Sequence, residues 1–265
     1  MSSSADNVIR SVQHQWSRLR FGGNYQLARD DVISMLTLFK AILFPERWRD
    51  IESIDQELIK LRNLLEVLLK GLISDNKAAA DKVINEIPVL VDKLNKDAEA
   101  IYAGDPSART IFEIILCYPG FQAVFGYRIA HIFYQLDVPV LPRIISEYYH
   151  TITGIDIHPG AQIGEYFCID HGTGIVIGET TVIGDRVRMY HGVTLGVKNF
   201  LEAKNGMLLK GYKRHPNVGN DVVLYANATI MGNITLGDGC IIGANAVVTE
   251  NVGNSELVKF EREVF

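Results

Sequence analysis

The chain has 265 residues, of which 48% are hydrophobic, and its formal net charge is −5 at pH 7. This length and hydrophobic content can fill the core of one large domain or of two smaller ones. The basic residues form no block, which argues against a nucleic-acid surface, and no apolar run reaches the roughly 18 residues of a membrane span.

The first 150 residues predict an α-helical domain. Their opening stretch, MSSSADNVIR, has no charged region followed by an apolar one, so no signal peptide is expected. From Ile51 to Leu72, apolar residues recur at alternating steps of three and four, which predicts an amphipathic helix. A second helical pattern starts at Lys77, and Pro88 predicts a break or a kink in it. Similar patterns predict helices over residues 5–18, 30–43, 109–117, 121–135 and 141–151.

Residues 151–250 predict a different fold, and 17 of the 23 glycines lie from Gly154 onward. Aliphatic residues recur there at every sixth position, with one slip of two residues after Ile169. The repeat consists of Ile157, Ile163, Ile169, Ile177, Ile183, Met189, Leu195, Val218, Leu224, Ile230, Leu236, Ile242 and Val248. A period of six fits short strands joined by corners, with one inward side chain per side and a glycine that permits the turn. We therefore predict a parallel β-helix of hexapeptide repeats.

The repeat is interrupted once and then ends. From Leu195 to Val218 is 23 positions where six would suffice, so a loop of residues 197–217 is expected to leave the coil. A long loop on a rigid scaffold is a frequent place for function. After Val248 the repeat stops, and residues 251–265 predict a short charged tail.

His171, in the stretch IDHGTG, is a candidate general base because a neutral imidazole accepts a proton readily near pH 7. Asp156 precedes it by 15 residues, close to one 18-residue coil, so stacking could place this carboxylate where it orients the ring. Spacing alone also allows a corner histidine without a task.

Two further positions carry charge where a ligand could use it. Arg214 and His215 end the long loop, where they predict either a fork for a carboxylate or a solvated basic tip. Asp105, in GDPSA, is also read as an ordinary helix N-cap.

The cysteines, Cys117, Cys168 and Cys240, are odd in number and far apart, which fits free thiols in a reducing, cytoplasmic compartment.

Seven motifs appear in the order DPSA, DIHPGAQIG, DHGTGIVIGET, GVTLG, RHP, MGNITLGDG and IGANAVV. Together they resemble the serine acetyltransferase family of the hexapeptide-repeat acyltransferases over roughly residues 100–250. The resemblance implies a left-handed β-helix that transfers the acetyl group of acetyl-CoA to the hydroxyl of L-serine, which gives O-acetyl-L-serine for cysteine biosynthesis. It assigns His171 as base and Asp156 as its partner, and it implies no metal.

The resemblance also implies binding residues and partners. Asp105 and Asp170 match residues that meet the substrate ammonium, and Arg214 and His215 match the pair at its carboxylate. Backbone positions along the coenzyme groove correspond to Gly196, Ala226, Gly243 and Ala244. A homo-trimer or a dimer of trimers is implied, with sites between protomers. O-acetylserine sulfhydrylase is a possible partner by resemblance, but the family inserts a C-terminal isoleucine, and Phe265 in this sequence argues against that docking.

Three alternatives stay open at this point. The long loop departs from the Gly-rich loop of the family, so the acceptor could be another small hydroxyl compound. A β-helix of this kind could also be a zinc-dependent carbonic anhydrase with His158, His171 and His191 as ligands. A scaffold without activity is the third alternative, and the complete set of candidate base, acid and fork argues against it.

Overall fold

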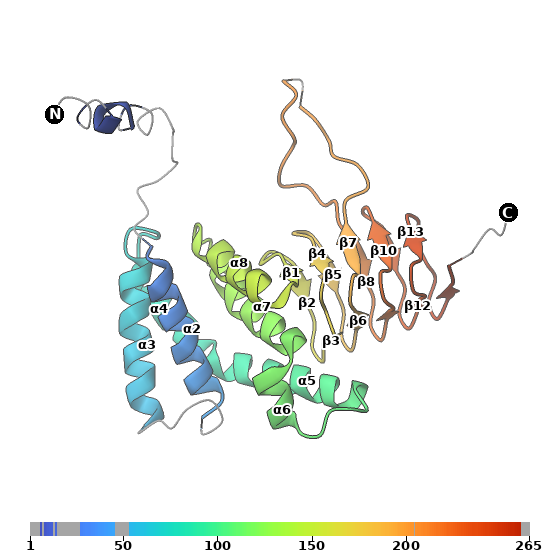
Figure 1. The fold of residues 1–265 in the computed structure, drawn as a ribbon, viewed down its shortest axis with the longest axis horizontal. Helices are drawn as coiled ribbons and strands as arrows, with labels where there is room; N and C mark the ends of the chain where they lie inside the picture. Colours follow the sequence, from blue (N-terminus) through green and yellow to red (C-terminus); the bar gives the residue numbers. More distant parts are fainter. Residues whose placement is uncertain are drawn as a thin grey trace.

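The computed structural model describes residues 6, 8–12, 14, 27–45, 53–203 and 205–260. In this part of the chain an α-helical region leads into a solenoid of short parallel strands (Figure 1), as predicted. Much of the helix predicted over residues 5–18 and the terminal Phe265 lie outside the described residues. No helix that the structure describes is long and apolar enough to cross a bilayer.

The helices follow the apolar periodicity and its breaks. They are α2 (Arg29–Leu43), α3 (Ile54–Leu69), α4 (Asn76–Asn85), α5 (Ile87–Gly104), α6 (Ile111–Cys117), α7 (Pro119–Gln135) and α8 (Leu141–Thr153). Asp75 caps α4 by accepting a hydrogen bond from the Ala78 N–H at 3.0 Å. Pro88 lies in the first turn of α5, where a missing N–H is tolerated, so the predicted break falls between two helices.

The solenoid has three parallel sheets, and each coil passes through all three in turn. The first sheet contains β1 (Asp156–Ile157), β4 (Val176–Ile177), β7 (Thr194–Gly196), β10 (Thr229–Met231) and β13 (Val247–Val248). The second contains β2 (Gln162–Ile163), β5 (Val182–Ile183), β8 (Asn217–Val218) and β11 (Thr235–Leu236). The third contains β3 (Cys168–Asp170), β6 (Arg188–Tyr190), β9 (Val223–Leu224), β12 (Ile241–Ile242) and β14 (Leu257–Val258). Every aliphatic residue of the six-residue repeat is buried in the solenoid core.

The two-residue slip in the repeat forms a widened corner between β3 and β4. His171 (φ 57°), Gly172 (φ 83°) and Gly174 (φ 81°) all adopt left-handed backbone conformations there. A Cβ atom at Gly172 would lie 2.4 Å from Ile155 Cδ1, so only glycine fits beneath the corner. His171 is therefore placed on a turn that the extra residues build.

Two segments leave or extend the regular coil. Residues 198–203 and 205–216 belong to an arm that projects from the solenoid between β7 and β8 (Figure 1), and an antiparallel bridge joins Glu202 to Leu208. The expected tail contains a further strand, β14, which pairs with β12. Val252 packs toward the core, only 8% exposed, but it lies four residues after Val248, so the sequence period does not reveal this last coil.

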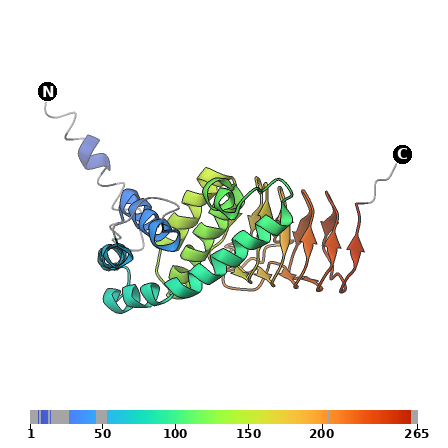
Figure 2. The same ribbon diagram turned by 90° about the horizontal axis from the view of Figure 1, so that it is seen from below.

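A buried ion pair joins the helices to the first coil. Asp97 of α5, 0% exposed, accepts hydrogen bonds from Arg128 Nε of α7 at 2.6 Å and from the Phe167 N–H at 2.9 Å. Arg128 also donates to the carbonyl oxygens of Ile163 and Gly164. Figure 2 shows α5 running from the helical region to the first coils, where it packs beside β3.

Candidate active site

His171 lies at the corner between the third and the first sheet. Its side chain is 74% exposed, and its Nε2 atom is 3.8 Å from Asp170 Oδ1. The ring of His191, at the same corner one coil further on, lies 5.9 Å from the His171 ring in an edge-on arrangement. We call Asp105, Asp170, His171 and His191 the His171 corner.

Asp105 ends α5 and caps no helix N-terminus, so the N-cap interpretation is wrong; Thr110 caps the next helix instead. Its Oδ1 atom accepts hydrogen bonds from the Ser107 N–H at 2.8 Å and hydroxyl at 2.6 Å. Its Oδ2 atom accepts one from the Tyr118 hydroxyl at 2.7 Å. These donors, Ser107 first, lower the pKa of Asp105, and the nearby charge of His171 adds to the effect. The His171 corner thus holds a carboxylate kept in its charged form.

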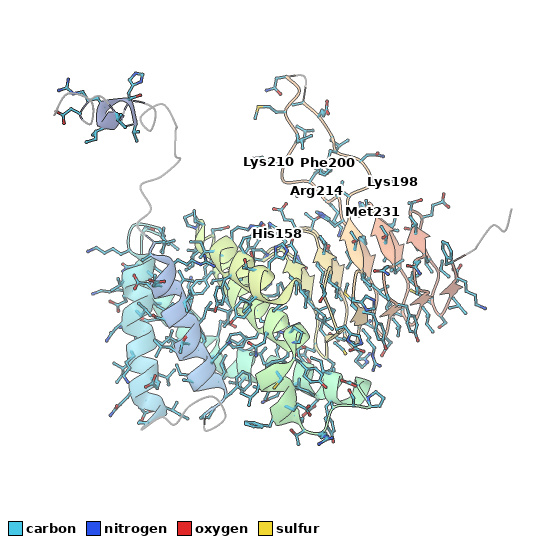
Figure 3. The ribbon with its side chains drawn as sticks, viewed as in Figure 1. His158, Lys198, Phe200, Lys210, Arg214 and Met231 are labelled. Atoms are coloured by element: carbon cyan, nitrogen blue, oxygen red, sulfur yellow. The ribbon has the colours of Figure 1, made fainter. Side chains whose placement is uncertain are left out.

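A second group of residues lies where the first sheet turns into the second. We call Glu179, Thr180, Arg214 and His215 the Arg214 corner. Arg214 Nη2 forms an ion pair with Glu179, and Arg214 Nη1 donates to the Tyr212 carbonyl at 3.3 Å. Figure 3 shows Arg214 at the base of the arm near His158, with Phe200 and Lys210 farther out.

His215 is buried at this second corner, with 6% of its surface exposed. Its Nδ1 atom accepts a hydrogen bond from the Thr180 N–H at 3.1 Å, so the proton of the neutral ring is on Nε2. Burial, and then the charge of Arg214, lowers the pKa of His215 to about 4. A Cβ atom at Gly178 would lie 2.0 Å from the ring, so this glycine makes room for it. His215 is a neutral donor near pH 7.

Acid is expected to destabilise the fold through His215. The folded pKa of about 4 lies below the ordinary value of about 6.5, so the unfolded chain binds the proton first. This contribution to stability is present above about pH 6.5 and is lost as the pH falls toward 4. Urea unfolding should show that the unfolding free energy falls less between pH 7 and pH 5 for His215→Asn than for the parent. The matched control is His150→Asn, which changes an exposed histidine.

The structure keeps the two corners apart. They lie at opposite ends of β4, and the Cα atoms of residues 175 and 178 alone are about 10 Å apart at about 3.3 Å per residue in a strand. Within one chain the two corners are therefore separate groups of side chains.

Asp156 does not contact His171 within the described residues. Asp156 pairs in register with Val176 on the first sheet, and its charge acts on His158. Asp170 is the carboxylate that lies within ion-pair distance of the His171 ring. No hydrogen bond or ion pair joins Asp156 to His171 among the described residues, so the dyad stays a prediction.

Within one chain the three histidines of the proposed zinc site do not come together. His158 packs edge-on against Tyr134 at 5.9 Å, and burial and the charge of Arg143 lower its pKa; it belongs beside the Arg214 corner. His171 and His191 lie at the other corner. Across the described ranges, no three His, Cys, Asp or Glu side chains gather as metal ligands.

Most of the predicted coenzyme positions share the corner of His171. Ala226 follows β9, and Gly243 and Ala244 follow β12, so they continue the row that begins at His171 and His191. Backbone hydrogen bonds of 2.9 Å from Asn227 to His191 and from Asn245 to Ala226 connect this row. Gly196 instead ends β7, the middle strand of the first sheet, on the side where the first sheet turns toward the second and the arm begins.

Sequence reasoning missed the residues that hold these groups. Tyr118 and Ser107 contact Asp105, and Glu179 contacts Arg214. Glu179 stands inside the quoted motif DHGTGIVIGET, which was the available signal, but it received no role. Tyr118 gives no such signal, because its contact depends on how α6 and α7 pack.

The chain is similar to known proteins over most of its length. Residues 215–250 match the family model described as bacterial transferase hexapeptide (six repeats). A plasmid-encoded serine acetyltransferase of Synechococcus elongatus is 43% identical over 251 residues, which cover 85% of this chain and 79% of that protein. The crystal structure of native serine acetyltransferase 1 from Entamoeba histolytica superposes with a TM-score of 0.78 at 35% identity, over 96% of this chain and 99% of the other.

A further crystal structure, of serine acetyltransferase in complex with coenzyme A from Brucella abortus strain S19, superposes with a TM-score of 0.63. Its identity is 27%, over 88% of this chain and 80% of that one. These likenesses agree with the predicted left-handed β-helix and do not favour the carbonic anhydrase alternative. The chain belongs to the serine acetyltransferase family.

Proposed function

We propose that the chain acetylates the hydroxyl of L-serine with acetyl-CoA, and that His171 is the general base. The observation that carries the assignment of residues is the division of charge between the two corners. Asp105 and Asp170 present carboxylates beside His171, whereas Arg214 presents a guanidinium and His215 a neutral N–H. A zwitterion with an ammonium, a carboxylate and one hydroxyl complements these groups.

The reaction follows from the exposed imidazole. His171 removes the hydroxyl proton while the serine oxygen attacks the acetyl carbonyl. The tetrahedral intermediate collapses, expels the coenzyme A thiolate, and the thiolate takes the proton back from His171. Burial raises the pKa of Cys168 to about 12 and that of Cys240 to about 11, so neither of these two buried thiols is suited to form a cysteine-bound intermediate.

The complete site forms between two copies of the chain. The His171 corner of one protomer would face the Arg214 corner of its neighbour, because within one chain the two corners are separate groups of side chains. Closed rotational symmetry then gives as many sites as protomers, and a trimer matches the three-sided solenoid. The coenzyme would follow the row of Ala226, Gly243 and Ala244, with Gly196 contributed across the interface.

Mixing two inactive variants tests this arrangement. Co-expressed His171→Ala and Arg214→Ala chains should recover about a quarter of the parental activity, because random assembly pairs two intact halves at about one site in four. Assayed well below the parental KM for serine, each variant alone keeps only a small residual activity. Activity no greater than the sum of the two variants alone would show that both corners serve within one chain.

An acceptor panel tests the substrate. Thiol release from acetyl-CoA should be fastest with serine and much slower with homoserine and threonine, because a longer or branched acceptor displaces its hydroxyl from His171. The same rate for all three would remove the claim for serine. An O-acetylserine sulfhydrylase partner gains no support here, and Phe265 lies outside the described residues.

The two candidate partners of His171 can be separated in the same assay. If Asp156 orients the imidazole, Asp156→Asn should lower kcat, since the ring then loses its preferred tautomer. Asp170→Asn should mainly raise the KM for serine, because Asp170 is assigned to the ammonium. The reverse pattern would give the orienting role to Asp170, whose Oδ1 atom lies 3.8 Å from the ring.

A further inference from the structure

Helix α7 places one tyrosine at each of its ends beside a corner of the site. Tyr118 immediately precedes the helix, and Tyr134 lies in its last turn. Each hydroxyl donates a hydrogen bond to a carboxylate, and the two carboxylates belong to different corners. The 17 residues of the helix extend about 25 Å, which is enough to pass from one corner to the other.

Tyr118 fixes the carboxylate of Asp105. The hydroxyl of Tyr118 is 2.7 Å from Oδ2, and Ser107 occupies Oδ1 with two donors. With donors on both oxygens, the carboxylate plane cannot rotate without breaking hydrogen bonds. Asp105 therefore presents its remaining acceptor positions in one direction, next to the His171 ring.

Tyr134 holds Arg214 in place indirectly, through the side chain of Glu179. Its hydroxyl donates to Glu179 Oε1 at 3.3 Å, and Glu179 Oε2 forms the ion pair with Arg214 Nη2. Burial opposes ionisation of Glu179, but the hydrogen bond and charge of Arg214 outweigh it and lower the pKa of Glu179. The guanidinium keeps further N–H donors free for a ligand carboxylate.

We propose that Tyr118 and Tyr134 are positioning residues for serine, one for its ammonium end and one for its carboxylate end. The inference rests on the proposed function, since it assumes that Asp105 and Arg214 bind serine. Binding groups held in place before the ligand arrives lose less freedom on binding, which favours affinity. Neither tyrosine touches serine; each acts through the charged group it holds.

Single-atom substitutions measure this role. Tyr118→Phe and Tyr134→Phe should each raise the KM for serine about 3- to 10-fold, with little change in kcat or in the KM for acetyl-CoA. The matched control is Tyr102→Phe on α5, where the ring is 45% exposed and outside both corners. Thermal unfolding of all three variants should stay close to that of the parent, which excludes loss of fold as the cause.

Two fragments of serine separate the two ends. Ethanolamine has the ammonium without the carboxylate, and 3-hydroxypropionate has the carboxylate without the ammonium. Both fragments should inhibit competitively with serine. Inhibition by ethanolamine should weaken only in Tyr118→Phe, and inhibition by 3-hydroxypropionate should weaken only in Tyr134→Phe. Equal weakening of both fragments by one tyrosine variant would overturn the assignment of ends.

The serine KM decides the inference by itself. If Arg214→Ala raises the KM for serine but the tyrosine variants leave this KM unchanged, the positioning role is wrong and the proposed function stands. If His171→Ala and Arg214→Ala also leave serine turnover unchanged, the proposed function itself is wrong. Glu179→Gln should reproduce the effect of Tyr134→Phe or exceed it, because it removes the charge that holds Arg214.

Discussion

Replacing His171 with alanine is expected to lower kcat by a factor of about 10²–10⁴ and to leave the fold intact. The loss follows because the serine hydroxyl is a poor nucleophile near pH 7 without a base. The fold is spared because the side chain is 74% exposed and its removal leaves no cavity. Initial rates of thiol release from acetyl-CoA, at saturating serine, measure the effect.

The neighbouring imidazole supplies the control. His191→Ala removes a ring 5.9 Å from His171 at the same corner, so it tests whether any histidine there would serve. Its kcat should stay within a few-fold of the parent. The assignment of His171 as the base would be contradicted if His171→Ala lowered kcat by less than tenfold, or if both variants lowered kcat equally.

Asp97→Ala is expected to cost about 3–5 kcal/mol of unfolding free energy, which is a large share of the stability of a typical domain. The substitution leaves Arg128 buried without its charged partner, and it leaves the Phe167 N–H without an acceptor. Urea unfolding followed by circular dichroism measures the loss. The control, Asp92→Ala, removes an exposed partner of Lys96 on the same helix and should change stability by less than about 1 kcal/mol.

A double variant separates the lost pair from the isolated charge. Asp97→Ala combined with Arg128→Met removes both charges, so it should recover part of the stability that Asp97→Ala loses. The double variant would be less stable than the single one if Arg128 stabilised the junction mainly by its bonds to the Ile163 and Gly164 carbonyls. Either order of stability identifies which interaction of Arg128 matters more.

The regular part of the fold could be predicted because its periodicity reflects burial directly. The apolar face from Ile51 to Leu72 leads to α3 (Ile54–Leu69), and the six-residue aliphatic repeat leads to the solenoid core. The sequence did not predict the last coil, because Val252 departs from the six-residue period although its side chain packs inward. A repeat predicts where coils are regular, and it does not show where a coil adapts to end the stack.

The site was predictable by residue type more than by arrangement. Asp156 and His171 are 15 residues apart, near the length of one coil, but the two-residue slip puts Asp156 in register with Val176, 20 positions on. Contacts between coils depend on that register, which local spacing does not fix. Ser107 and Glu179 stand inside the motifs DPSA and DHGTGIVIGET but carried no assigned role, whereas the contact of Tyr118 with Asp105 depends on helix packing and has no motif.

The helical region covers only one end of the solenoid, and this makes its coils unequal. The first coil is held by the Asp97 and Arg128 pair, whereas the last ends at β14, where Leu257 is 51% exposed. In a stack of repeats each coil is stabilised by its neighbours, so amide protons should exchange fastest in the coil of β14, which lies farthest from the helices. We therefore expect amide protons at the corner of His171 to exchange more slowly than those around β12 and β14.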